Sequence, residues 1–270
     1  MAKPKHIEIG DGLLIPILYE DRSALAIDKP PGWLLAPDSW DKTARNLQLA
    51  LLSSINAGDF WARSRNLRFL RFVHRLDADT SGVLLLAKSP GSLQALSRLF
   101  ETRQVEKVYW AVVEGIPKND RWVCKLSLAP DPVAPDRMRV VRQSDARQDR
   151  SHRRDFKSQI SNLRSQSSNP KAQIAKPAET HFRVLNAGLS TALIEARPST
   201  GRTHQIRVHL AVTGHPVVSD VLYGSGRVRD QAEPSPIALR AVKLAYHDPF
   251  TKRRVEIRAP TDQFTRQLGF

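Results

Sequence analysis

Residues 82–115 alternate between strand and helix patterns without a repeat period. The run GVLLLAKS at 82–89 is typical of a short buried strand, and KVYWAVVEG at 107–115 has the β-branched and aromatic residues that strands favour. Between them, SPGSLQALSRLFETRQ at 89–104 starts with a Ser-Pro pair and carries leucines at helical spacing. This order of strand, helix and strand predicts a fold that mixes α and β structure.

Three other segments extend this prediction. The segment LAIDKPPGWLLAP at 25–37 indicates a strand that runs into a Pro-Pro-Gly turn, because proline cannot continue a strand ladder. Residues 43–56 have apolar side chains at helical spacing and predict a helix with Thr43 as its N-cap. Residues 179–198 predict a β-hairpin with its turn at 186–188.

The net charge narrows the classes of partner. The chain has 270 residues, and its 42 Lys and Arg against 27 Asp and Glu give a formal charge of +15 and a pI near 10.4. Such a charge attracts polyanions, although it does not by itself separate nucleic acid, an anionic membrane and simple solubility. The hydrophobic content of 41% is that of a folded globular protein.

Membrane insertion and secretion find no support in the sequence. The longest apolar stretch, LLIPILY at 13–19, contains a proline and is far shorter than the roughly 20 residues of a spanning helix. Residues 1–10 lack the apolar core of a secretory signal. The single cysteine, Cys124, can form no internal disulfide and no multi-cysteine zinc module, so a reducing, cytoplasmic location is expected.

The composition changes between about residues 143 and 176, where Arg, Ser, Gln and Asn dominate and aromatic residues are scarce. Counted over 142–176, nine Lys and Arg face three Asp, a net charge of +6 with few apolar anchors. The pattern predicts a flexible basic insertion rather than a domain. An RNA-grasping arm and a solvated linker are both compatible with it.

The stretch HRLDADTSG at 74–82 places two carboxylates beside an arginine in a turn before an apolar run. Its DADTSG part matches the first six positions of an EF-hand calcium loop. The twelfth position of that loop must supply a bidentate carboxylate, but Lys88 stands there. Calcium binding is therefore disfavoured, and Asp79 is expected to shape the turn through its side chain.

The segment at 197–216 predicts a helix that begins near Thr203, as N-cap, and ends at Gly214. On this helix His204 and Arg207 share one face, while Ile206 and Leu210 share the opposite, buried one. His204 and His209 are five residues apart and diverge, which argues against a metal-binding helix.

The arginines of this segment allow two interpretations. Arg202 and Arg207 could contact phosphate or remain solvated at the surface. Alternatively, Arg207 could lie in the interior beside a carboxylate, because a guanidinium holds Asp ionised and in a fixed orientation. An ionised, oriented Asp is what a carboxylate nucleophile or base requires.

Other catalytic signatures are absent from the sequence. It contains no GxxxxGK[ST] phosphate loop and no GxSxG nucleophile elbow. The GSGRV stretch at 224–228 lacks the third glycine of a dinucleotide fingerprint, and Cys124 has no neighbour that would make it a nucleophile.

Taken together, four segments resemble the motifs of the RluA family of RNA pseudouridine synthases, in the family's order and over about residues 20–260. HRLDADTSG resembles the central motif, and KVYWAVVEG is similar to the K-x-Y strand. GRTHQIRVHLAVTGHPVVSDVLYG at 201–224 resembles the third motif, and AIDKPPGWLLAP the first strand and turn. The chain departs from the usual pattern at Ser219, where Gly is frequent, and at Arg240, where His is common.

The resemblance implies a role for each matching residue. Asp77 would be the catalytic carboxylate, which either attacks ribose C1′ or abstracts a sugar proton. Tyr109 would stack on the target base and could act in proton removal from C5. Arg207 would pair with Asp77, holding it ionised and aimed, and Arg75 would fill the gap that the flipped nucleotide leaves in the RNA. Lys107, Arg202 and His204 are expected to contact RNA, and the reaction needs no metal and no organic cofactor.

The resemblance also implies an α+β fold with a mixed, largely antiparallel sheet and flanking helices. We expect one catalytic domain over residues 1–270, without an N-terminal S4-type RNA-binding domain, because only about 25 residues precede the first strand. The expected partner is structured RNA, either rRNA or tRNA, with no membrane and no obligatory protein partner. Alternatives are a non-catalytic RNA-binding protein on the same scaffold, or an unrelated DNA-binding module, for which no recognition helix is evident.

Overall fold

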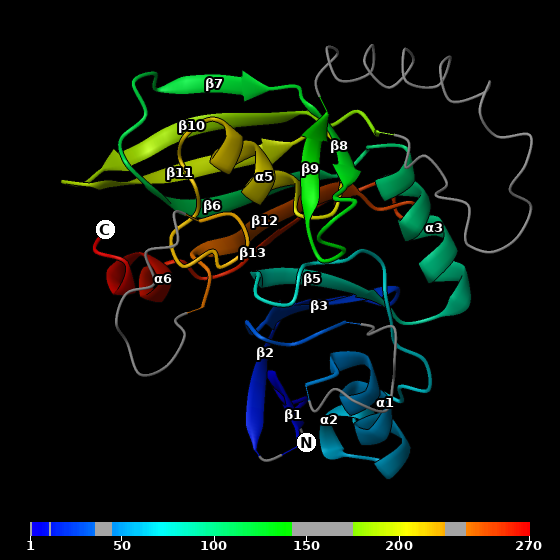
Figure 1. The fold of residues 1–270 in the computed structure, drawn as a ribbon. Coiled ribbons are helices and arrows are strands. Elements are labelled where there is room, and N and C mark those ends of the chain that lie inside the picture. The colour runs from blue at the N-terminus through cyan, green and yellow to red at the C-terminus, as the bar shows by residue number, and fades with distance from the viewer. Residues whose placement is uncertain (1, 11, 36–44, 142–174, 225–235) are drawn as a thin grey trace, which may run out of the picture.

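The computed structural model describes residues 2–10, 12–35, 45–141, 175–224 and 236–270 of the chain (Figure 1). The strands of its large sheet are β1 (His6–Ile9), β2 (Leu13–Glu20), β3 (Ala24–Lys29), β4 (Arg71–Phe72), β5 (Ser81–Ala87), β6 (Glu106–Glu114), β7 (Arg121–Cys124), β10 (Thr180–Ala187), β11 (Thr191–Pro198), β12 (Leu239–His247) and β13 (Arg254–Arg258). A separate two-stranded sheet contains β8 (Ser127–Pro130) and β9 (Met138–Val141). The helices are α1 (Leu47–Ala57), α2 (Phe60–Arg63), α3 (Pro90–Glu101), α5 (Gln205–Val212) and α6 (Asp262–Gln267).

The large sheet is mixed but largely antiparallel. Its strands follow the order β1-β2-β3-β5-β12-β6-β11-β10-β7, with β13 paired to β12 and β4 paired to β5. Among the described strands, β5 and β12 are the one parallel pair in this sheet. The predicted fold class, α+β with flanking helices, is confirmed.

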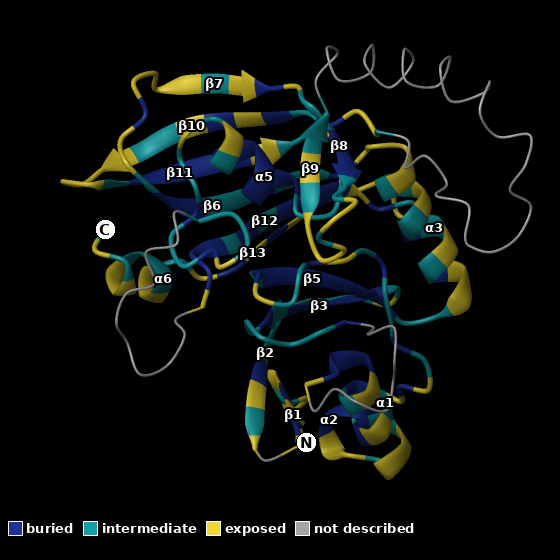
Figure 2. Ribbon diagram, viewed as in Figure 1, coloured by how far each residue is buried: buried dark blue, intermediate teal, exposed yellow. Residues whose placement is uncertain are grey.

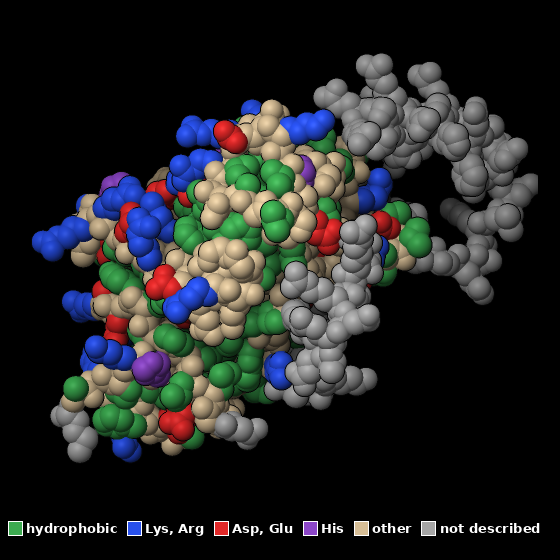
Figure 3. Space-filling view, turned by 90° about the vertical axis from the view of Figure 1, so that its left-hand side faces the viewer, with side chains coloured by type: hydrophobic (Ala, Val, Ile, Leu, Met, Phe, Trp, Pro, Cys, Tyr) green, Lys and Arg blue, Asp and Glu red, His purple; other side chains and the backbone are tan. Residues whose placement is uncertain are grey.

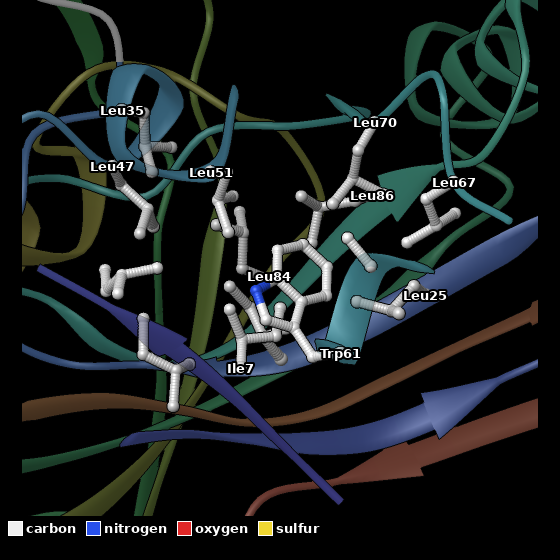
Figure 4. Packing of buried hydrophobic residues seen from close by; sticks show 14 of the residues in the cluster. Ile7, Leu25, Leu35, Leu47, Leu51, Trp61, Leu67, Leu70, Leu84 and Leu86 are labelled. Atoms are coloured by element: carbon white, nitrogen blue, oxygen red, sulfur yellow. The ribbon is translucent and has the colours of Figure 1, made fainter. Parts of the chain in front are cut away.

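Four apolar clusters are formed by the described residues, and the two that meet at the predicted site lie on the two halves of the large sheet. One joins β1, β2, β3 and β5 to α1 and α2, and Figure 4 shows Trp61 of α2 packed among Leu84, Ile7 and other aliphatic side chains. The other joins β6, β10 and β11 to α5. Figure 2 shows the central strands buried and the outer strand β7 largely exposed. Tyr109 packs against both cores, so the boundary between the two halves passes through a predicted site residue.

Gly82 allows the two halves to join. Ser81 and Gly82 of β5 pair in parallel with Arg240 and Ala241 of β12, and Gly82 has a φ of +108°. A Cβ at this position would lie 2.1 Å from the carbonyl oxygen of Ala241. Only glycine permits both the backbone conformation and this close approach. The Ser-Gly that ends the HRLDADTSG motif is therefore fixed by the sheet that it enters.

Arg240 strengthens the same junction. Its guanidinium donates to Asp28 Oδ2 at 2.6 Å, to Ser81 Oγ at 3.2 Å and to the Pro260 carbonyl at 3.0 Å. The side chains of Arg240 and Asp28 are only 11% and 15% exposed. The residue that departs from the family pattern thus ties β12 to the β3 and β5 strands beside the central motif.

The structure corrects two predicted helix starts. Helix α1 begins at Leu47, and its N-cap is Asn46, whose side chain accepts from the Leu49 N–H. Thr43, the predicted cap, lies outside the described residues. Helix α5 begins at Gln205 after His204, which has a left-handed φ of 54° and makes no side-chain cap hydrogen bond. The prediction of Thr203 as N-cap is therefore wrong.

The other predicted elements are present with shifted ends. The hairpin consists of β10 and β11, but its turn is closed by Gly188 N–H donating to the Thr191 carbonyl rather than lying at 186–188. The predicted basic insertion at 143–176 lies, except for residues 175 and 176, outside the described residues. Lys176 pairs through its backbone with Leu128 of β8.

No helix in the described ranges combines the length and the apolar character that crossing a membrane would require.

Candidate active site

A buried lysine holds the loop that carries Asp77. Lys29, at the end of β3, has no exposed surface, and its Nζ donates to the carbonyls of Pro30 at 3.0 Å, Ala78 at 2.6 Å and Thr80 at 3.1 Å. The loop is closed by a further bond, from Thr80 N–H to the Asp77 carbonyl at 3.2 Å. The first motif of the sequence therefore clamps the backbone on which the central motif places its carboxylate.

Lys29 also places a positive charge next to the loop that carries Asp77 and Asp79. Burial lowers the pKa of Lys29 to about 8, while the negative charges of Asp79 and Asp77 oppose this shift. Asp79 is exposed, and no described residue forms a hydrogen bond with its side chain. The expectation that the Asp79 side chain shapes the turn is therefore wrong, because backbone groups and Lys29 do so instead.

Arg207 lies in the interior between two carboxylates. It is 3% exposed, and its Nε and Nη2 donate to Asp220 Oδ2 and Oδ1, each at 2.7 Å. Its Nη1 lies 3.9 Å from Asp77 Oδ2. The predicted ion pair with Asp77 is present, but it is the longer of the two, and a bidentate pair with Asp220 fixes the guanidinium.

Asp220 is a residue of the site that the sequence did not predict. Its side chain has no exposed surface, and Oδ1 also accepts the N–H groups of Leu222 and Tyr223 at 3.0 and 3.1 Å. Ser219, just before it, has a left-handed φ of 63°. An Asp in such a tight turn is a recognisable sequence signal, but the signal does not reveal which arginine the carboxylate binds.

Tyr223 completes the surroundings of Arg207 and was also missed. The Arg207 guanidinium lies 5.2 Å from the centre of the Tyr223 ring, within cation–π range. The Tyr223 hydroxyl is 2.9 Å from His204 Nδ1 and accepts the Met138 N–H at 2.7 Å. Burial alone would lower the pKa of Arg207, but Asp220, followed by Asp77, raises it, and the net direction is upward. Arg207 is therefore a permanent cation in this site.

His204 is held uncharged by its surroundings. Burial is the main cause that lowers the pKa of its imidazole, and the positive charges of Arg207 and Arg75 act in the same direction against Asp77 and Asp220. With Nδ1 engaged by Tyr223, the ring is a fixed neutral group on the wall of the site.

Tyr109 reaches the site from β6. Its neighbours across the sheet are Ala196 of β11 and Ala241 of β12, two small residues that leave room for its ring. Burial raises the pKa of the Tyr109 phenol, and the negative charge of Asp77 raises it further. The phenol therefore keeps its proton at neutral pH.

Gln205 fixes the opposite wall. Its Oε1 accepts from Thr200 Oγ1 at 2.7 Å and from Arg202 N–H at 3.0 Å, while its Nε2 donates to the Glu179 carbonyl and to Thr180 Oγ1, both at 2.9 Å. These four bonds hold the loop before α5 against β10, so that loop is a preformed part of the site.

These side chains meet around one cavity of about 570 Å³. Ligand sites commonly have volumes of about 300–1,000 Å³. All seven residues that the sequence analysis selected line it: Arg75, Asp77, Lys107, Tyr109, Arg202, His204 and Arg207. Three sequence motifs separated by up to about 130 residues thus converge on one concave surface, to which they contribute one carboxylate, one phenol and several cations.

Comparison with known proteins decides the family. The family model described as RNA pseudouridylate synthase matches residues 23–212. The chain belongs to the RNA pseudouridylate synthase family. It is 31% identical over 264 residues to the ribosomal large subunit pseudouridine synthase C of Buchnera aphidicola, covering 95% of this chain and 70% of that protein. It is also 31% identical to an uncharacterized RNA pseudouridine synthase of Zymomonas mobilis, covering 94% of this chain and 97% of that one.

A solved structure agrees with this assignment. The human RNA pseudouridylate synthase domain-containing protein 4 superposes with a TM-score of 0.67 at 25% identity, over 93% of this chain and 91% of that chain. The chain is thus an isomerase that acts on RNA, as the sequence predicted. The comparisons give no support to the alternative of a non-catalytic RNA-binding protein.

Proposed function

We propose that this protein converts a uridine of ribosomal RNA to pseudouridine, with Asp77 as the catalytic carboxylate. The observation that carries the proposal is the convergence of Asp77, Tyr109 and Arg207 on the 570 Å³ cavity. Ribosomal RNA is favoured over tRNA because relatives such as the Buchnera protein are named for the large ribosomal subunit. We also propose that the protein acts in the cytoplasm and that residues 1–270 form one catalytic domain, in keeping with the ribosomal relatives.

In this reaction the target nucleotide leaves its stack and enters the cavity. It must do so because Asp77 lines the cavity and its side chain is only 19% exposed, so that a base stacked in a duplex cannot reach it. The bond between N1 and C1′ breaks, the uracil turns, a bond forms between C5 and C1′, and the proton that C5 loses is balanced by one that N1 gains. Asp77 starts this sequence by attack at C1′ or by abstraction of a sugar proton. Arg207, locked by Asp220, keeps a positive charge 3.9 Å from the Asp77 carboxylate throughout.

Cationic side chains around the cavity would hold the RNA. Arg75 is exposed two residues before Asp77, where it can occupy the gap in the RNA stack. Arg202 is partly exposed, with its Nε donating to the Pro177 carbonyl at 3.1 Å, and its other donors can contact phosphate. His204, held neutral, can contact the nucleotide by hydrogen bonding or stacking.

Tyr109 is proposed to stack on the target uracil. A phenol that keeps its proton is poorly suited to act as a base. Its ring, in contrast, is available for stacking at any pH. We expect Tyr109→Leu to weaken binding of target RNA roughly 10- to 100-fold, because base–aromatic stacking contributes about 1–3 kcal/mol per base. Tyr109→Phe keeps the ring and should retain the affinity.

Titration of both variants against the same labelled RNA measures this difference. Phe100→Leu is not a suitable control, because Phe100 already stacks on His74. Phe250→Leu, in the turn between β12 and β13, is the better one, because its side chain is exposed and lies outside the cavity. Equal affinity of wild type and Tyr109→Leu would rule out the stacking role.

The function itself is tested by mapping new pseudouridines. Unmodified total RNA is incubated with the purified protein, and carbodiimide-dependent reverse-transcription stops are located afterwards. We expect discrete new stops in large-subunit ribosomal RNA. Stops confined to tRNA would overturn the proposed substrate, and no stops in any RNA class would overturn the proposed activity.

A further inference from the structure

Four cations that line the cavity have no carboxylate partner among the described residues, and two of them, Lys107 and Arg103, lie close to each other. Arg207 is held by Asp220, and on the rest of the protein many basic residues are paired; Glu106, for example, contacts Arg197, Lys243 and Arg254. On the face shown in Figure 3, basic side chains likewise lie next to acidic ones. Among the described residues, however, no carboxylate lies within ion-pair distance of Lys107 or Arg103, although both line the cavity.

Arg103 occupies a position where helices usually place glycine. Helix α3 ends with the two hydrogen bonds of a Schellman motif. Arg103 N–H donates to the Phe100 carbonyl at 3.2 Å, and Gln104 N–H donates to the Leu99 carbonyl at 2.8 Å. This ending requires a left-handed residue, and Arg103 has a φ of 59°. A residue with a side chain is strained in this backbone conformation, and glycine would avoid the strain. The presence of arginine at this position therefore indicates that its side chain has a function.

Lys107 extends into the same corner from β6. Its Nζ donates to the Thr200 carbonyl at 3.0 Å and lies against the bare backbone of Gly201. The other side of the corner is apolar, because His74 stacks on Phe100 with ring centres 4.7 Å apart. One of the three ammonium donors is thus engaged, and no described acceptor forms a hydrogen bond with the other two.

We propose that Arg103 and Lys107 form a subsite that binds a phosphodiester group of the RNA, next to the nucleotide that enters the cavity. The inference rests on the proposed function, because it assigns a place to the backbone of the same substrate. Two neighbouring cations without a carboxylate create the positive potential that a phosphate neutralises, and the strained Arg103 is accounted for by its contact with the ligand. The partial negative charge at the C-terminus of α3 would by itself favour a cation at position 103. It does not explain the second cation, Lys107, which lies on β6.

Proton binding should accompany phosphate binding. Burial, followed by the positive charge of Arg103, lowers the pKa of Lys107 to about 8. A bound phosphate favours the ammonium form, so the affinity should fall as the pH rises from 7 to 9 and Lys107 loses its proton in the free protein.

The other ionisable groups around Lys107 do not produce this pH dependence. Arg103 at the end of α3 and Arg202 before α5 remain charged. His74, whose pKa burial lowers to about 4, and Tyr109, whose pKa burial raises, stay uncharged over this range. The carboxylate nearest to this corner along the chain is that of Glu101, at the rim of the cavity, and it forms no ion pair with Lys107 or Arg103.

The test compares the unchanged 270-residue protein with Lys107→Met, Lys107→Arg, Arg103→Gly and the double variant Lys107→Met/Arg103→Gly. The probe is an unmodified transcript of large-subunit ribosomal RNA. Lys118→Met and Arg98→Ala are matched controls, because both side chains are exposed outside the cavity and Arg98 lies on the same helix as the subsite. The dissociation constant is measured against salt concentration and pH, and the melting temperature of each variant is recorded.

We expect Lys107→Met and Arg103→Gly to weaken binding roughly tenfold each and to reduce the log–log salt slope by about 0.7–0.9. The double variant should lose less than the sum of the two, because both side chains hold one ligand. Lys107→Arg should remove the pH dependence between 7 and 9. Arg103→Gly should lose affinity without a lower melting temperature, since glycine relieves the left-handed strain.

Affinities and salt slopes equal to those of the two controls would overturn the subsite, as would a pH dependence that survives Lys107→Arg. A failure of the proposed function gives a different result. A transcript that binds in a Lys107-dependent manner but acquires no pseudouridine would contradict the proposed target and leave the phosphate subsite in place.

Discussion

Replacing Asp77 by Asn should abolish pseudouridine formation and leave RNA binding intact. Asn keeps the size and shape of the side chain, but its amide can neither attack a ribose carbon nor accept a proton as a base. We expect the rate to fall on the order of 10⁴-fold, the upper range for loss of a positioned acid–base or nucleophilic group. The Asp77 side chain is 19% exposed and contacts Arg207 only at 3.9 Å, so the fold should tolerate the change.

Single-turnover modification of the mapped uridine, together with titration of the same RNA, measures both parts of this prediction. Glu101→Gln is the matched control, because Glu101 is another carboxylate that lines the cavity but lies at its exposed rim, at the end of α3. It should modify the RNA as fast as the wild type. An Asp77→Asn protein that retains the wild-type rate would show that another group performs the chemistry.

The sequence predicted the members of the site better than their contacts. Asp77, Tyr109 and Arg207 were recognised because each stands in a continuous motif whose order along the chain is informative. Local patterns also predicted the strands and helices that carry them, since apolar runs and helical spacing are properties of neighbouring residues. The ends of these elements were less accurate, because tertiary contacts fix them, as the left-handed His204 before α5 illustrates.

The partners across the fold could not be read from the sequence. Asp220 is 13 residues from Arg207 and reaches it only because the chain turns back at Ser219, with a φ of 63°. Lys29 is 49 residues from Ala78, whose carbonyl it binds. Both are charged side chains that a sequence would place at the surface, yet both are fully buried because hydrogen bonds satisfy them. Such burial is a property of the assembled sheet rather than of any local motif.

The buried ion pair of Asp220 and Arg207 gives the second large prediction. Asp220→Asn removes the charge that balances the Arg207 guanidinium and replaces two acceptor oxygens by one. Asp77, at 3.9 Å, cannot take over both donors without leaving its place. Breaking a buried pair in this way costs about 3–5 kcal/mol, because the remaining charge is left uncompensated away from water. We expect a loss of this size in the free energy of unfolding.

Denaturant unfolding of the variant measures this loss, and Glu256→Gln provides the comparison. Glu256 pairs with Arg254 and Arg258 at the surface, where solvent screens the ion pairs, so its loss should cost much less stability than the loss of the buried Asp220 carboxylate. The double variant Asp220→Asn/Arg207→Met removes the unpaired charge and should recover part of the stability that Asp220→Asn loses.

In these two variants, stability and catalytic activity should not change in parallel. Asp220→Asn, assayed at a temperature where it remains folded, should modify RNA more slowly than the wild type, because Arg207 is no longer held and its donors can turn to Asp77. The double variant should be more stable than Asp220→Asn and yet no more active, since the cation beside Asp77 is gone. Recovery of activity together with stability would show that Asp220 supports only the fold. Wild-type stability of Asp220→Asn would contradict the buried pair itself.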